Sequence, residues 1–105
     1  MAKIGPYELD SIVTGDCREL AQALPDESID LVLTDPPFGI GFQYDGYSDN
    51  GGDYLALVTW IAETAQRIIK PGGLCFVFQA QPQLRNTWPL FPANSRLFVA
   101  AKNFV

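Results

Sequence analysis

The 105-residue sequence contains no histidine, and it has 7 basic residues against 12 acidic ones, for a net charge of −5. Without histidine, a Ser-His-Asp triad, a histidine metal site and a histidine pH switch are all excluded. The few lysines and arginines are spread singly along the chain. A protein that grips nucleic acid by itself clusters such residues to neutralise phosphates. The charge balance therefore argues against a free-standing nucleic-acid clamp.

Cysteine and long apolar runs are also scarce. The two cysteines, Cys17 and Cys75, cannot complete a typical structural zinc site when histidine is absent, so we expect no metal. No stretch approaches 18 consecutive apolar residues, and no apolar run follows a basic N-terminal region, so we expect neither a membrane span nor a secretory signal. The expected location is the cytoplasm, with both thiols reduced and mostly buried; one disulfide in a secreted domain is the alternative.

The apolar pattern predicts a single α/β domain over residues 1–105, with mostly parallel strands and flanking helices. The predicted strands are 9–14, 29–34, 74–78 and 97–101, and the predicted helices are 18–24, 54–70 and 83–88. The run IDLVLT at 29–34 is apolar without alternation, which is typical of a parallel strand buried on both faces. Trp60 and Trp88 are interpreted as packing residues.

Turn residues divide these elements. Residues 39–52 are rich in glycine and aromatic side chains, and we predict a flexible loop there, which is either functional or mobile with incidental aromatics. Asp53 is expected to cap the helix that follows. The tetrapeptide at 70–73, Lys-Pro-Gly-Gly, is expected to end that helix, because proline cannot continue it and glycine accepts positive φ.

One tetrapeptide has residues that are suited to a catalytic site. Asp35-Pro36-Pro37-Phe38 comes directly after the strand 29–34, and ligands of open α/β sheets bind just outside the carboxyl ends of the strands. Two consecutive prolines fix φ and hold the preceding residue extended, so the carboxylate and a neighbouring carbonyl become two rigid acceptors. Two acceptors suit one planar amino group, and the phenyl ring offers a face for stacking a base. The pattern favours alkylation of an exocyclic amine, although a rigid capped turn remains the plainer interpretation.

Three motifs in order resemble a known family. TGDC at 14–17, IDLVLTDPPF at 29–38 and IIKPGGLCFVF at 68–78 are similar to the amino-methyltransferases of DNA, in the motif order called the beta class. The resemblance extends from residue 9 to residue 78, and more weakly to the C-terminus. It implies a partial Rossmann-like sheet, S-adenosylmethionine as methyl donor, and methylation of adenine or, less favoured, cytosine, as in restriction–modification.

The resemblance also implies roles for individual residues. Asp35 and the carbonyl of Pro36 would accept hydrogen bonds from the target amine, Pro37 belongs to the same rigid turn, and Phe38 would stack on a flipped base, although tyrosine is commoner there. Asp16 and Cys17 would lie beside the cofactor, together with Asp35. From the residues alone, an ordinary turn capped by Asp16 is the alternative.

Two parts of the family pattern are not found in the sequence. No F-x-G-x-G or comparable glycine loop follows a strand, and no basic recognition region is present. We therefore expect residues 1–105 to be an incomplete catalytic domain that reaches DNA through other regions or a partner chain. An open sheet edge would favour a homo-oligomer or a complementary subunit. The alternatives are an inactive interaction module, or a methyltransferase for RNA, protein or a small molecule.

Overall fold

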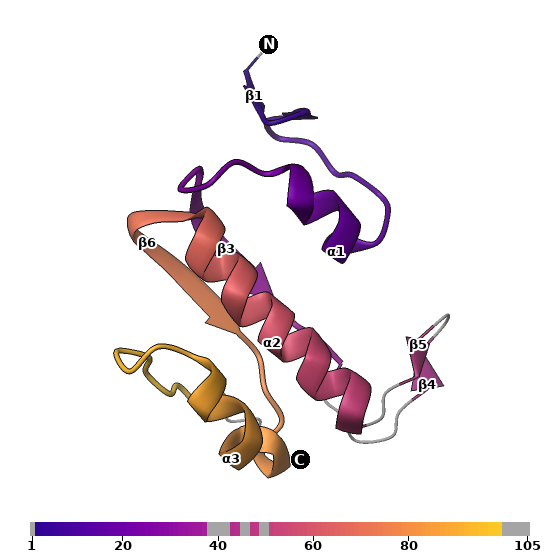
Figure 1. The fold of residues 1–105 in the computed structure, drawn as a ribbon, viewed down its shortest axis with the longest axis vertical. Coiled ribbons are helices and arrows are strands. Elements are labelled where there is room, and N and C mark those ends of the chain that lie inside the picture. The colour runs from indigo at the N-terminus through magenta and orange to yellow at the C-terminus, as the bar shows by residue number, and fades with distance from the viewer. Residues whose placement is uncertain (1, 38–42, 45–46, 49–50, 100–105) are drawn as a thin grey trace, which may run out of the picture.

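A computed structural model describes residues 2–37, 43–44, 47–48 and 51–99 (Figure 1). Its regular elements, in chain order, are β1 (Lys3–Ile4), β2 (Tyr7–Glu8), α1 (Cys17–Leu20), a 3-10 turn (Ala21–Ala23), β3 (Ile29–Thr34), β4 (Gln43–Tyr44), β5 (Tyr47–Ser48), α2 (Gly51–Ile68), β6 (Ile69–Val77), a 3-10 turn (Gln81–Gln83), α3 (Leu84–Thr87) and a 3-10 turn (Trp88–Leu90). No described helix is both long and apolar enough to cross a membrane.

The centre of the fold is the parallel pair of β3 and β6, which α2 connects. Leu31, Leu33 and Thr34 are paired with Leu74, Phe76 and Val77, respectively. Figure 1 shows α2 running in front of β3 and alongside β6. A strand, a helix and a second parallel strand form the basic α/β unit, so the predicted class is confirmed at this level. A pair of parallel strands is too small to identify a whole Rossmann-like sheet.

One stripe of α2 forms the hydrophobic core. The buried apolar residues recur at the three- and four-residue spacing of a helix face, as the sequence predicted, and they are Tyr54, Val58, Ile61, Ala62, Ala65 and Ile68. The helix begins at Gly51 rather than near residue 54. Asp53 is therefore an exposed residue of the first turn, not a residue that precedes the helix.

The opposite face of the strand pair is bare. Its large apolar side chains are between 43% and 65% exposed, and they are Leu31, Leu33, Leu74, Phe76 and Phe78. The prediction that strand 29–34 is buried on both faces is therefore wrong, because α2 covers only one of them. The accessible surface of the chain is 7985 Å², whereas a folded monomer of 11.6 kDa exposes ~5800 Å², so this chain exposes more surface than is usual for its size. We refer to the sheet face that carries Leu31, Leu33, Leu74, Phe76 and Phe78 as the bare face.

The N-terminal third differs from the prediction. Residues 11–14 form no regular structure, and a small antiparallel hairpin of β1 and β2 precedes them. The expected strand 9–14 is wrong because its apolar residues find no sheet neighbour, and Ile12 is 97% exposed. The expected helix 18–24 is present as α1 and the 3-10 turn after it, which together end at Ala23.

Arg67 attaches this N-terminal segment to the end of α2. Its guanidinium donates to the carbonyl oxygens of Leu24 and Ala21 at 2.7 and 3.0 Å, and it forms an ion pair with Asp26 at 3.1 Å. The backbone nitrogen of Ser28 donates to the carbonyl of Ile68 at 2.8 Å. The planar fork of arginine can serve several acceptors at once, so this side chain and the backbone hydrogen bond of Ser28 together hold the segment that leads into β3.

The C-terminal part and the cysteines also differ from expectation. Residues 97–99 are exposed and form no strand, while residues 100 and 101 of the predicted strand lie outside the described residues. The predicted helix 83–88 is confirmed as α3 with a 3-10 turn at each end. Both cysteines are free and exposed, so the expectation of mostly buried thiols is wrong. Partial burial nevertheless raises the pKa of Cys75.

Two further predictions fall in the middle of the chain. The expected loop 39–52 contains the short antiparallel pair of β4 and β5, and its last two residues begin α2. Residues 39–42, 45–46 and 49–50 of that loop lie outside the described residues. The tetrapeptide at 70–73 belongs to β6 as an irregularity, since Ile29 pairs with Ile69 but Leu31 pairs with Leu74. Three extra residues are therefore accommodated where the helix passes into the strand.

We predict that shortening one core side chain of α2 destabilises the chain. Ile61 is 6% exposed, and Ile61→Val leaves a small cavity, so the free energy of unfolding should fall by about 1 kcal/mol. Urea denaturation followed by circular dichroism measures this loss. The control Gln66→Ala, on the exposed side of the same helix, should change stability by less than about 0.5 kcal/mol. Equal losses in both variants would contradict the assigned core.

The two glycines of the irregularity provide a matched test. A Cβ on Gly73 would lie 2.5 Å from Cγ2 of Ile69 and 2.8 Å from the carbonyl oxygen of Asp30, whereas one on Gly72 would meet nothing within 4 Å. Gly72 has a φ of +84°, so alanine there costs about 1 kcal/mol of backbone strain. Gly73→Ala must also displace the backbone, and it should destabilise the chain more than Gly72→Ala in the same denaturation assay. The reverse order would refute this packing.

Candidate active site at the carboxyl end of the parallel strands

Asp35 lies where the sequence predicted, directly after β3. The ladder continues for one residue beyond β6, because the backbone nitrogen of Phe78 donates to the carbonyl of Thr34 at 3.0 Å. Asp35 is exposed and Pro36 is buried. Among the described residues, the Asp35 side chain has no hydrogen-bond or ion-pair partner. A rigid backbone thus presents a free carboxylate at the edge of the sheet.

This arrangement can bind a hydrogen-bond donor. An ionised carboxylate is acceptor-only, and the carbonyl of Pro36 adds a second acceptor one residue further along the chain. The two prolines limit how far these groups can move. Pro37 is half-buried, and Phe38 lies outside the described residues, so its stacking role remains a prediction. The described edge therefore offers acceptors for an amino group.

Asp16 has a local structural role in α1. It is the N-cap residue, and its side chain accepts a hydrogen bond from the backbone nitrogen of Arg18 at 2.9 Å. The Arg18 guanidinium also contacts both carboxylate oxygens, at 3.2 and 3.1 Å. The side-chain hydrogen bond from Arg18, then its backbone hydrogen bond, hold the pKa of Asp16 below its usual value. Cys17 follows as the exposed first residue of the helix.

The described contacts do not join the two predicted halves of the site. Asp16 and Cys17 would reach the edge that carries Asp35 if residues 9–14 formed a strand beside β3, because carboxyl ends of parallel strands meet at one edge. Those residues are not paired with β3 here. No group of three metal-ligating side chains occurs among the residues that the structure describes. Asp35, Pro36 and Pro37 thus follow β3 as predicted, whereas no described contact joins Asp16 and Cys17 to them; the catalytic and cofactor roles of these residues stay predictions.

Sequence reasoning missed Gln79 at the same edge. It lies two residues after β6, and its side-chain oxygen accepts a hydrogen bond from the hydroxyl of Tyr54 in α2. The available signal was a polar residue directly after the apolar run LCFVF, which is the position that Asp35 occupies relative to β3. Two strands that are parallel neighbours must present the residues after them at one edge.

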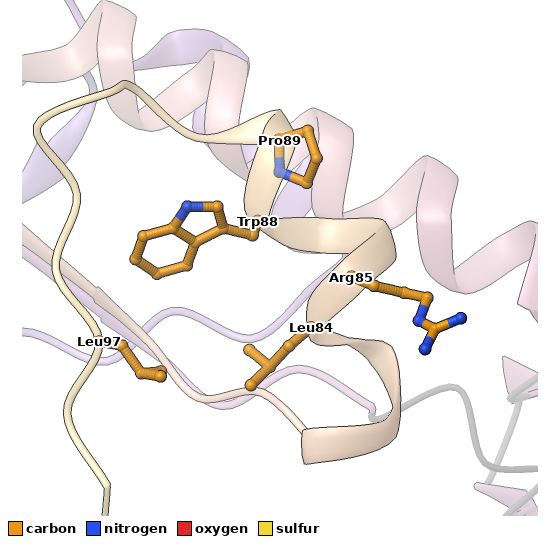
Figure 2. Close-up of a pocket in the computed structure, with 5 residues that line it drawn as sticks. All are labelled: Leu84, Arg85, Trp88, Pro89 and Leu97. Carbon is orange, nitrogen blue, oxygen red and sulfur yellow. The ribbon is translucent and has the colours of Figure 1, made fainter.

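A separate apolar pocket lies near α3 (Figure 2). It is an open hollow of about 400 Å³, and it is lined by Leu84, Arg85, Trp88, Pro89 and Leu97. Figure 2 shows the Trp88 ring and the Leu97 side chain on opposite sides of this space. Trp88 is 44% exposed, so it packs less closely than expected. None of the residues that line this pocket belongs to the predicted catalytic or cofactor motifs.

We predict that the Asp16 pKa depends on Arg18. The folded-state pKa lies below the unfolded one, so the pair stabilises the chain above the unfolded pKa, and this contribution is lost as pH falls through the folded pKa. Arg18→Met should raise the pKa of Asp16 toward its ordinary value, as measured by a carboxyl-carbon NMR titration. Arg96→Met is the control and should leave it unchanged. An unshifted Asp16 in Arg18→Met would disprove the pairing.

No family model matches the chain, but comparison with curated proteins finds relatives that are similar over part of their length. The chain is 39% identical over 83 residues to the type II methyltransferase M.BamHI of Bacillus amyloliquefaciens, covering 72% of this chain and 19% of that protein. It is 33% identical over 91 residues to the type II methyltransferase M.BglII of Bacillus subtilis, covering 86% of this chain and 24% of that protein. It is 29% identical over 76 residues to the DNA adenine methyltransferase YhdJ of Escherichia coli, covering 70% of this chain and 26% of that protein.

The matched regions therefore span most of this chain but only about a quarter or less of each relative. The three motifs, their order and the position of Asp35 after a parallel strand agree with this relationship. Over most of its length the chain is thus similar to type II DNA methyltransferases, of which it matches only a part.

Proposed function

We propose that this chain supplies the catalytic part of an S-adenosylmethionine-dependent DNA amino-methyltransferase. The target would be the exocyclic amine of a base, with adenine favoured over cytosine, as in restriction–modification. One observation carries the proposal: at the carboxyl end of β3, beside buried Pro36, the carboxylate of Asp35 is exposed and has no partner among the described residues. A DNA substrate would place the protein in the cytoplasm.

Asp35 and Pro36 would act on the geometry of the target amine. Two acceptors that take both amine hydrogens draw the nitrogen from planar toward tetrahedral, which exposes its lone pair for attack on a methyl group. The two prolines hold the acceptors in place before the base arrives, so little reorganisation is needed during the reaction. Phe38 would stack on the base after it leaves the duplex. None of these roles needs a histidine.

S-adenosylmethionine would supply an electrophilic methyl group, and the described residues fit it only in part. Asp35 is free to face a ligand, and Cys17 is exposed. Asp16 has both carboxylate oxygens engaged by Arg18, so it would contact the cofactor only after that ion pair rearranges. The proposed cofactor residues are thus Asp35, Asp16 and Cys17, with the glycine loop of the family supplied from outside this chain.

The remaining parts of the enzyme would pack against this chain. A parallel sheet is normally covered on both faces, and the bare face has no cover among the described residues. The net charge of −5 also requires that a basic DNA-binding surface come from elsewhere. We infer that further segments of the protein, a second copy or a complementary subunit supply both.

The bare face also favours a second candidate function. Five exposed apolar side chains on one sheet face are typical of a protein-interaction surface. The chain would then be a methyltransferase-like interaction module without activity. The two candidates differ in what they require of Asp35, because an interaction through the bare face does not involve its carboxylate.

A methyl-transfer assay tests the proposal. Labelled S-adenosylmethionine is incubated with the protein and with DNA, RNA or protein substrates, and binding of the cofactor is measured by calorimetry. Asp35→Ala should lower methyl incorporation into DNA by about a hundredfold or more, because it removes one acceptor of the target amine. Glu63→Ala, on the exposed side of α2, should keep it. Incorporation that survives in Asp35→Ala would reject the proposal, and no binding at millimolar cofactor would reject catalysis by this chain alone.

A further inference from the structure

Phe78 has a half-exposed aromatic ring at the carboxyl end of the parallel strands. It is the first residue after β6, and its side chain is 49% exposed. It is also the last side chain of the bare face, so it lies at the rim of that face rather than at its centre. Ligands of open α/β sheets bind just outside this end of the strands. The position therefore suits a residue that contacts a ligand.

The hydrogen-bond register places Asp35 directly opposite Phe78. Thr34 pairs with Val77, and the backbone nitrogen of Phe78 donates to the carbonyl of Thr34 at 3.0 Å. In a parallel ladder, a residue whose nitrogen donates to a carbonyl lies opposite the residue that follows that carbonyl. Neighbouring strands are about 5 Å apart, so the backbones of the two residues are separated by about that distance.

The side chains of Asp35 and Phe78 lie on the same face of the sheet. Side chains alternate between the two faces along a strand, and paired residues of neighbouring strands share a face. Leu33 and Phe76 are paired on the bare face. Two residues further along each strand, Asp35 and Phe78 return to that face, and both are exposed. Pro36 keeps the preceding residue extended, so the alternation continues as far as Asp35.

A carboxylate beside an aromatic ring matches a flat ligand that carries an amine. The ionised carboxylate only accepts hydrogen bonds, so it selects a group with N–H donors. The phenyl ring offers a surface on which a planar base can stack, and such stacking tolerates any base. We propose that Phe78 is a base-contacting residue, whose ring stacks on the base while the exocyclic amine of that base donates to Asp35. The proposal rests on the function proposed above and adds the residue that orients the plane of the base.

The other aromatic ring of the bare face provides a matched control. Phe76 has the same side chain on the same face, and it is 43% exposed. It is paired with Leu33, however, so no carboxylate lies opposite its ring. Leu31, Leu33, Leu74 and Phe76 all belong to the strands themselves, and a covering segment can pack on them without reaching the rim. A packing role therefore concerns Phe76 at least as much as Phe78, whereas a role in binding concerns Phe78 alone.

Three variants test the contact by NMR titration with 2′-deoxyadenosine. Phe78→Leu removes the ring but keeps an apolar side chain and the backbone hydrogen bond, and it should weaken binding about tenfold, as expected for the loss of one stacked base. Phe78→Trp restores a flat ring and should bind about as tightly as the wild type. Phe76→Leu should leave binding unchanged. Equal weakening in Phe78→Leu and Phe76→Leu would overturn the proposal.

A nucleoside without the amine separates the two contacts. 2′-Deoxynebularine is deoxyadenosine with hydrogen in place of the amine, so Asp35→Ala should weaken binding of deoxyadenosine but not of deoxynebularine. Phe78→Leu should weaken binding of both, because stacking does not use the amine. In the wild-type protein, intermolecular nuclear Overhauser effects should connect the base protons with the ring of Phe78 and not with that of Phe76. These contacts decide the question if Phe78→Leu fails to fold.

The outcomes distinguish this inference from the proposed function. If methyl incorporation into DNA is lost in Asp35→Ala but is unchanged in Phe78→Leu, and no base proton contacts the Phe78 ring, the role of Phe78 is rejected and the proposed function stands. Wild-type protein that binds neither nucleoside at millimolar concentration also rejects the role of Phe78. If incorporation survives in Asp35→Ala, the proposed function itself fails, and this inference fails with it.

Discussion

The parallel pairing of β3 and β6 is the constraint on which the rest of the structure depends. Parallel strands need a crossover, and α2 provides it while covering one face with its stripe of buried side chains. The same pairing brings the residues that follow both strands to one edge. The packing arrangement that stabilises the chain thus also determines where Asp35 and Pro36, the proposed acceptors of the target amine, leave the sheet.

The same pairing explains why one face of the sheet has no cover among the described residues. A two-stranded parallel sheet has two open edges and two faces, and the described elements cover only the face beneath α2. Leu33 and Phe76 stay exposed on the other. The acidic charge, and the exposed Asp35 that has no partner among the described residues, support the proposal that a DNA-binding surface is supplied elsewhere. The relatives, of which this chain matches about a quarter or less, contain the length needed for these parts.

Local sequence signals predicted the elements that local physics determines. The strand 29–34, the helical periodicity from Val58 to Ile68 and the position of Asp35 after a strand follow from apolar spacing and proline stereochemistry, and all are present. The strand expected at 9–14 failed because strand formation needs a neighbour, and none lies there among the described residues. Gln79 was missed because its importance depends on a buried contact with Tyr54, 25 residues away in the sequence, which no local pattern indicates.

NMR measurement of the hydrogen bond between Phe78 and Thr34 tests the central claim most directly. The account predicts a scalar coupling across this bond, from the amide nitrogen of Phe78 to the carbonyl carbon of Thr34, with a slowly exchanging Phe78 amide and close contacts between Leu33 and Phe76. This result would place Asp35 and Phe78 opposite each other where the strands end. A fast-exchanging Phe78 amide without that coupling, or an antiparallel contact pattern, would contradict it.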